Sequence, residues 1–237
     1  MSARASRAWI LLAASLLLAL AAAGCGGGKK AKQLSVGEIV AQTAKKTAAL
    51  KSFHFVFKVE NAPSGRPGLN LTFADGDLIV PDKLRASVAG TLSGISLKSE
   101  IVFVGPKQFL KDPLTQTWRT LETKTSPVAF FDPAKGVLAV IKGASKLELA
   151  GSESVGGADS YRLKGVVRAR DVTAILGNPP SDKLVNVELW VGKSDLVLRR
   201  IRLEGPVSAG EAANIARTVE ISSFDKSVKI EPPQAAG

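Results

Sequence analysis

The sequence predicts a single α+β domain made predominantly of antiparallel strands, about ten of them, with three or four short helices. Apolar and polar residues alternate in segment after segment between residues 52 and 224, which is typical of strands with one buried face. Short links rich in Gly, Pro, Ser and Asp join these segments, as in an antiparallel meander. The chain has 237 residues, 45% of them hydrophobic, which suits one large domain better than a disordered chain.

Helical spacing occurs only in short stretches. The first helix is predicted over residues 38–50, with Ser35 as its N-cap and Glu38 completing a capping box. Further helices are predicted over residues 133–141, ended by Gly143, over residues 171–176, and as a brief insert near residues 209–216. Strands are predicted at residues 52–61, 69–73, 84–92, 95–103, 108–111, 117–121, 146–154, 160–167, 184–191, 196–204 and 218–224, with a turn or bulge at 74–76.

The composition excludes several kinds of site. A single Cys excludes a disulfide framework, and a single His excludes any constellation that needs two imidazoles. A hydrolase or transferase would have to combine a Ser, Thr or carboxylate nucleophile with His54, but His54 lies in a predicted strand and the chain has no Gly-x-Ser-x-Gly elbow. We therefore expect no enzyme activity, no catalytic residues, no metal and no cofactor.

The N-terminus carries the features of an export signal. Arg4 and Arg7 precede an apolar run over residues 9–23 that has no acidic group. Residues 20–25, Leu-Ala-Ala-Ala-Gly-Cys, span the end of this run and resemble the bacterial lipobox, with Ala22 where Leu is preferred. We therefore expect a signal peptide at residues 1–24, lipidation at Cys25 and a flexible basic tether at 25–34. The folded domain is expected at 35–231 and a disordered tail at 232–237.

The predicted sheet has more apolar surface than the predicted helices can cover. Ten strands spaced by about 4.8 Å make a sheet about 48 Å wide, whereas three helices about 10 Å wide cover about 30 Å of it. Large exposed apolar patches are rare on monomers. Either the sheet curls until the helices fill it and make a solid core, or an apolar ligand occupies the gap, and the periodicity does not choose between these outcomes.

Several segments of the chain resemble the LppX/LprAFG family of actinobacterial lipoproteins. They are the lipobox, the amphipathic first helix followed by an aromatic strand, the strand pair at 187–191 and 196–206, the last strand at 219–224 and the ending at 228–233. The resemblance implies a curved half-barrel sheet with helices on its concave face, similar to the LolA/LolB-like carriers. It also implies an apolar cavity between sheet and helices that holds the acyl chains of envelope lipids.

The expected function is that of an exported, membrane-anchored lipoprotein on the extracytoplasmic side of the cell membrane. It would bind and carry lipids or glycolipids with long acyl chains across the envelope, as a monomer, together with a transporter partner and without nucleic acid. The alternative is a ligand-free structural or sensor protein with a filled core. Arg66, Arg168 and Arg170 are candidates for binding headgroups or are solvated surface charges. The expected cavity lining, which a one-residue slip in register would invert, comprises Phe53, Phe55, Phe57, Leu71, Phe73, Leu84, Val88, Ile101, Phe103, Val137, Val140 and Ile141.

Overall fold

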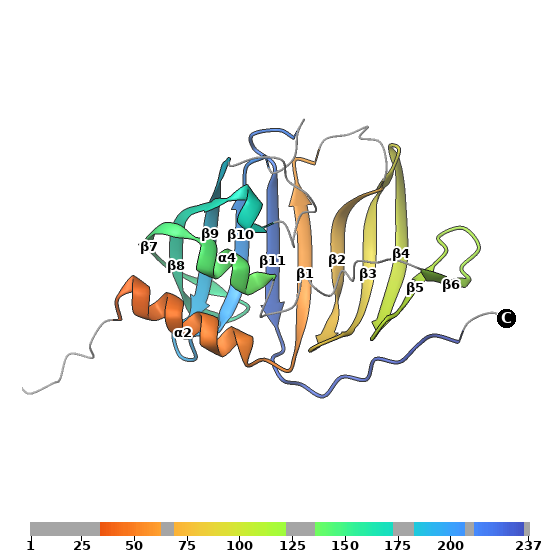
Figure 1. Ribbon diagram of the computed structural model, residues 1–237, viewed down its shortest axis with the longest axis horizontal. Coiled ribbons are helices and arrows are strands. Elements are labelled where there is room, and N and C mark those ends of the chain that lie inside the picture. The colour runs from red at the N-terminus through yellow and green to blue at the C-terminus, as the bar shows by residue number, and fades with distance from the viewer. Residues whose placement is uncertain (1–33, 63–68, 122–135, 173–182, 207–210, 235–237) are drawn as a thin grey trace, which may run out of the picture. The chain divides into compact units, whose positions relative to one another are not determined.

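The folded part of the chain is built around one open antiparallel sheet of eleven strands (Figure 1). The computed structural model describes residues 34–62, 69–121, 136–172, 183–206 and 211–234. The strand order is β6-β5-β4-β3-β2-β1-β11-β10-β9-β8-β7, so the first and last strands pair at the centre and the two edges are β6 and β7. The predicted fold class, an antiparallel sheet with short helices, is confirmed, and each of the eleven segments predicted as strands overlaps one of its eleven strands.

The elements follow one another in the expected order. The helices are α2 (Val36–Ala48), α4 (Val137–Gly143) and the 3-10 turn η1 (Ala169–Val172). The strands are β1 (Ser52–Glu60), β2 (Leu69–Ile79), β3 (Lys83–Leu92), β4 (Ile95–Val104), β5 (Lys107–Lys111), β6 (Trp118–Leu121), β7 (Ser145–Val155), β8 (Ala158–Arg168), β9 (Leu184–Gly192), β10 (Leu198–Glu204) and β11 (Ala216–Ser222).

The two faces of the sheet differ sharply in chemistry. One face, which we call the inner face, carries rows of apolar side chains: Phe55 pairs with Ile221, for example, and Ile201 pairs with Leu189. The other, the outer face, carries cross-strand ion pairs, among them Arg200 with Glu220 at 3.0 Å. Because side chains alternate along a strand, the period of two in the sequence separates these faces.

Both helices cover one part of the inner face. In α2, Ser35 and Glu38 form the predicted capping box, and the side chains that face the sheet are buried. In α4, Val140 and Ile141 are almost fully buried. Figure 1 shows α2 and α4 in front of the β7–β10 part of the sheet, where their buried side chains join the core.

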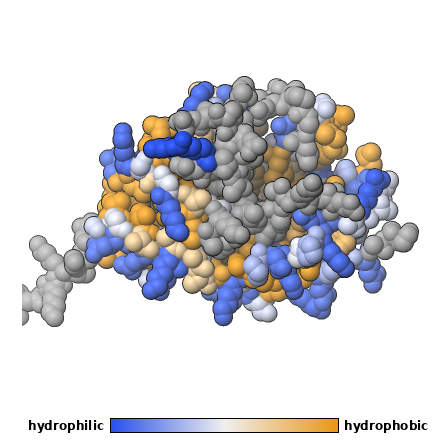
Figure 2. All heavy atoms as spheres, in the orientation of Figure 1, coloured by the Kyte–Doolittle hydropathy of each residue, from blue (hydrophilic) through white to orange (hydrophobic). Residues whose placement is uncertain are grey.

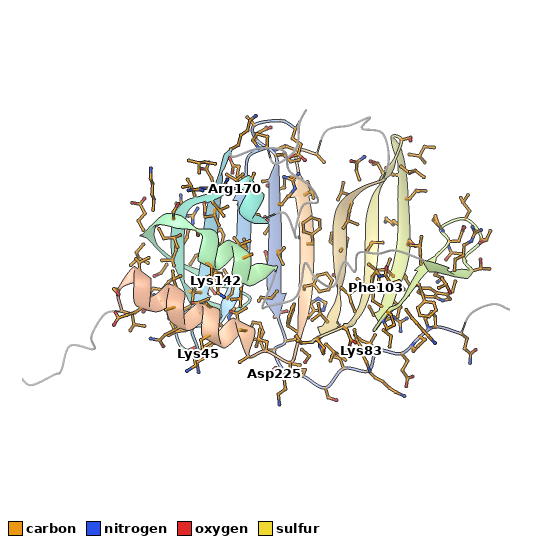
Figure 3. The ribbon with its side chains drawn as sticks, viewed as in Figure 1. Lys45, Lys83, Phe103, Lys142, Arg170 and Asp225 are labelled. Carbon is orange, nitrogen blue, oxygen red and sulfur yellow. The ribbon has the colours of Figure 1, made fainter. Side chains whose placement is uncertain are left out.

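The outer face near the start of β1 is crossed by the chain end. The segment 225–234, which we call the C-terminal strap, begins at Asp225, which Figure 3 labels. The Asp225 amide donates to the Ser52 carbonyl at 2.8 Å, and the Lys51 amide donates to the Asp225 carboxylate at 2.7 Å. Further along, Ile230 is buried against Val102 and Phe109. The strap therefore covers an apolar cluster on the outer face of β4 and β5.

Three local predictions differ from the structure. Residues 74–76 are not a turn, since β2 runs through them, and its irregularity lies between Leu71 and Phe73. Residues 211–215 are not helical, because β11 starts at Ala216 and the chain only turns before it. Gly143 belongs to α4 rather than following it. The leader, Cys25 and most of the tether, the turn at 63–68 and most of the helix predicted at 171–176 lie outside the described residues.

We expect Ile230→Asp to lower the free energy of unfolding by about 3–5 kcal/mol, because it places a carboxylate among apolar side chains and removes their contacts. Chemical denaturation of the full chain measures the effect. Lys229→Ala, which changes an exposed neighbour in the same strap, should stay within about 0.5 kcal/mol of the parent. Equal stability of the two variants would show that the strap does not contribute to the fold.

Candidate functional site

The inner face opens into an apolar pocket at the end of β2–β4 that is uppermost in Figure 1. The pocket has a volume of about 240 Å³ and its lining is almost wholly apolar; it includes Leu71, Gly90, Leu92, Leu97, Leu110 and Pro113. Figure 2 shows hydrophobic surface at this end of β3 and β4. Beside it, the exposed fractions are 45% for Leu71, 46% for Leu92 and 67% for Ile95. At this pocket the apolar inner face reaches the surface.

Close packing of β2 against β3 shapes this pocket. A Cβ atom built on Gly90 would lie 2.3 Å from the Asn70 carbonyl oxygen, so the two strands can approach here only with glycine. The irregularity between Leu71 and Phe73 sits at the same place. We infer that the bulge and Gly90 together turn Leu71 toward the pocket.

Most of the predicted lining residues share the inner face. The pairings of β1–β5 place Phe53, Phe55, Phe57, Leu71, Leu84, Val88, Ile101 and Phe103 on it. Of these, only Leu71 and Val88 border the apolar pocket, whereas the aromatic residues of β1 and β4 are buried in the core beyond it. Val140 and Ile141 face the sheet from α4, and the side chain of Val137 lies outside the described part of the chain.

Phe73 lies apart from the other residues of that set. It pairs with Lys58 and with Ala89, which belong to the outer face. The cause is the extra residue Thr72 in β2, which shifts the alternation by one position. The prediction that Phe73 lies on the inner face was wrong, because a period of two counted from Leu71 takes no account of an inserted residue.

One charged pair is buried on the inner face. Arg217 pairs across the strands with Val59 and Leu203, at a position where the pattern of β11 requires an apolar residue. Its guanidinium forms an ion pair with Glu211, and the exposed fractions of the two side chains are 10% and 3%. In the sequence, Arg217 stands two residues before Val219, so the alternation of the strand places it on the inner face. A charged residue at such a position indicates a buried ion pair.

The outer face carries a second, larger cavity. We call it the outer groove; its volume is about 630 Å³, and its lining includes Phe73, Ser87, Lys98, Glu100, Lys111 and Gln116. Lys111 binds Glu100 at 2.9 Å, and Arg85 approaches the same carboxylate at 3.4 Å. The hydrogen bond from Lys111, together with its charge and that of Arg85, holds the pKa of Glu100 below its usual value. The groove thus presents fixed charges beside an aromatic side chain.

His54 contacts two carboxylates on the outer face. Its Nδ1 lies 3.0 Å from Asp77 and its Nε2 lies 3.4 Å from Asp75. Among the residues that the structure describes, no group of three His, Cys, Asp or Glu side chains is arranged to hold a metal ion. None of the described helices is long and apolar enough to cross a membrane.

A family model for LppX_LprAFG lipoproteins matches residues 35–230, the whole of the sheet and both helices. The chain belongs to the LppX_LprAFG lipoprotein family. Lipoarabinomannan carrier protein LprG of Mycobacterium tuberculosis (strain H37Rv) is 25% identical to it over 233 residues, 94% of each chain. LprG of Mycolicibacterium smegmatis is also 25% identical, over 92% of this chain and 94% of its own.

Solved structures of this family have the same fold. LprF from Mycobacterium bovis has a TM-score of 0.68 at 16% identity and covers 84% of this chain and 96% of its own. LppX from Mycobacterium tuberculosis has a TM-score of 0.59 at 18% identity and covers 83% of this chain and 100% of its own. These similarities confirm the resemblance inferred from the sequence and the open antiparallel sheet of this LppX_LprAFG protein.

We expect Arg217→Met to lower the free energy of unfolding by about 3–5 kcal/mol, since it leaves the buried Glu211 carboxylate without its ion pair. The double variant Arg217→Met/Glu211→Gln should recover much of this loss, because no charge then remains buried. Urea denaturation of both variants measures the difference. A double variant less stable than the single one would contradict the assignment.

We also expect Glu100 to stabilise the fold in a pH-dependent way. Since its folded pKa lies below the usual value of 4.5, its contribution is present above that pH and is lost as the pH falls through the folded pKa. The stability difference between the parent and Glu100→Gln should therefore be constant near neutral pH and should shrink as the solution is acidified below 4.5. A difference that does not change over this range in denaturant titrations would refute the expectation.

Proposed function

We propose that this LppX_LprAFG lipoprotein binds the acyl chains of an envelope lipid or glycolipid against its inner face and carries that lipid across the cell envelope without catalysis. The observation that carries the proposal is the unequal covering of the inner face. Helices α2 and α4 cover the β7–β10 part, while the apolar pocket at the ends of β2–β4 leaves Leu71 and Leu92 nearly half exposed. An apolar ligand at this opening removes that surface from water.

The relatives support the same chemistry. LprG, which is 25% identical over almost the whole chain, is named a lipoarabinomannan carrier protein. The pocket of about 240 Å³ is smaller than the ~300–1,000 Å³ of typical ligand sites. We therefore interpret the pocket as the entrance to a larger site. The deeper part of that site would be lined by Phe53, Phe55 and Phe57 of β1 and Phe103 of β4.

The physical mechanism is hydrophobic transfer. Each methylene group moved from water to an apolar site contributes about 0.8 kcal/mol, so two C16 chains contribute more than about 20 kcal/mol before costs. A lipid bound this strongly does not leave into water at a useful rate. Exchange therefore requires an acceptor membrane or an envelope transporter that contacts the open end of the inner face.

The membrane anchor belongs to the same proposal. Lipidation at Cys25 would hold the domain on the extracytoplasmic side of the membrane, since attached acyl chains bind membranes in proportion to their buried methylenes. The full chain has a net charge of +11, and removal of the leader with Arg4 and Arg7 leaves +9, which favours approach to an anionic lipid surface. The protein would work there as a monomer.

Lipid analysis of the protein from its host tests the proposal. The full chain with Cys25→Ser, which cannot be acylated, is purified in mild detergent, washed and extracted with organic solvent for mass spectrometry. A near-stoichiometric diacyl lipid, absent from a control protein purified in the same way, is the expected result. An extract without lipid would favour the alternative, a structural or sensor protein with a filled core.

We expect Leu71→Asp to reduce lipid uptake at least tenfold, because it places a carboxylate in the mouth of the pocket. Leu184→Asp is the matched control, since Leu184 is also apolar and is 58% exposed at the start of β9, away from the pocket. Uptake of a fluorescent fatty acid by the full chain reports both variants. If they bind the probe equally well, the pocket is not the entry site.

A further inference from the structure

The strand β4 has a free edge over half its length. On one side it pairs with β3 along all ten residues, but on the other it pairs with β5 only from Ile101 to Val104. Among the described residues, no strand pairs with this side of residues 95–100. After Lys111 the chain leaves the sheet in a turn that Asp112 caps, accepting from the Leu114 and Thr115 amides at 2.9 Å each. The sheet therefore ends in a notch beside β4.

The two cavities lie back to back across this notch. The apolar pocket and the outer groove share Val88, Ala89 and Ser99 in their linings, although most of their other side chains come from opposite faces. Consecutive residues of β4 show the division, since Leu97 lines the pocket and Lys98 lines the groove. A single strand edge thus separates an apolar site from a charged one.

The turn after β5 borders both cavities as well. Pro113 lines the apolar pocket, and Gln116, three residues later in the same turn, lines the outer groove. The Ser99 hydroxyl donates to the Lys111 carbonyl, which ties β4 to the start of this turn. A ligand that leaves the pocket beside Pro113 therefore meets the groove after crossing one strand.

The chemistry of the groove suits a polar, negatively charged group. Lys98 is exposed and forms no ion pair with any described residue, whereas Lys111 and Arg85 share the Glu100 carboxylate. An ammonium group binds phosphate or sulfate oxygens strongly. The Ser87 hydroxyl, the Gln116 amide and the Glu100 carboxylate provide donors and acceptors for hydroxyl groups.

We propose that the outer groove binds the headgroup of the carried lipid, which is anionic and rich in hydroxyl groups, and that the lipid bends around the free edge of β4 between its acyl chains and this headgroup. Lys98 binds the anionic group, and the polar side chains around Glu100 bind hydroxyls. This inference rests on the proposed function and adds the headgroup class and its place. It also explains why a charged cavity lies directly behind the apolar one.

Affinities of the full chain with Cys25→Ser for two probes test the headgroup site. The probes are dipalmitoyl phosphatidylinositol, which has an anionic polyol headgroup, and dipalmitoylglycerol, which has the same chains without it. Lys98→Glu should weaken binding of the first at least tenfold and leave the second unchanged. Ser87→Asp, which adds a negative charge to the same groove, should act in the same direction. Circular dichroism confirms that both variants fold.

Lys45→Glu is the matched control, because Lys45 is an exposed lysine on α2, far from β4 across the sheet (Figure 3). It should change neither affinity. Equal effects of Lys98→Glu and Lys45→Glu would overturn the headgroup site while leaving lipid binding intact. Binding of water-soluble inositol phosphate as tightly as the lipid would also overturn it, since the groove would then serve a soluble anion. Failure of the parent to bind either lipid would overturn the proposed function itself.

Discussion

An eleven-stranded sheet with one apolar face presents more hydrophobic surface than the two short α-helices in the described part of the chain can cover. At about 1.5 Å per residue, the 13 residues of α2 and the 7 residues of α4 span ~20 Å and ~10 Å, against a sheet ~50 Å wide. The helices lie over the β7–β10 part, and the other half of the inner face ends in the apolar pocket at Leu71 and Leu92. The core and the candidate site therefore lie on the same apolar face of the sheet. They differ in that helices cover the core but not the candidate site.

The outer face shows why only one side of the sheet is available to an apolar ligand. Arg162 and Arg200 stack on the Trp190 ring at 5.4 and 4.9 Å from its centroid, and the ring nitrogen donates to Glu153 at 2.8 Å. Cross-strand contacts of this kind give the outer face a polar surface and fix the register of its strands. On β3–β5 the outer face continues with the ion pairs of Arg85 and Lys111 to Glu100, and Glu100 and Lys111 also line the outer groove.

The period of two and the capping box were sufficient to predict the sheet and α2 from the sequence, because both are local. The bulge at Thr72 was not predictable in this way, and it moved Phe73 to the other face of the sheet. The buried pair of Arg217 and Glu211 and the strap at Ile230 depend on segments far apart in the chain. The notch beside β4 arises because β5 is shorter than β4, and the alternation of apolar and polar residues does not predict how the two strands align. The roles of the predicted lining residues and of Cys25 stay predictions.

The position of the candidate site at a strand edge has a consequence for lipid exchange. A ligand enclosed between sheet and helices leaves only if the helices move, which costs the contacts of residues such as Ile39 and Ile141. A ligand held at the open end, with its headgroup in a groove that is already exposed to solvent, can be withdrawn along the edge of β4 without such a movement. The main barrier to transfer is then the exposure of the acyl chains to water, which direct contact with an apposed membrane avoids. A carrier with this geometry needs contact with its acceptor more than it needs a conformational change.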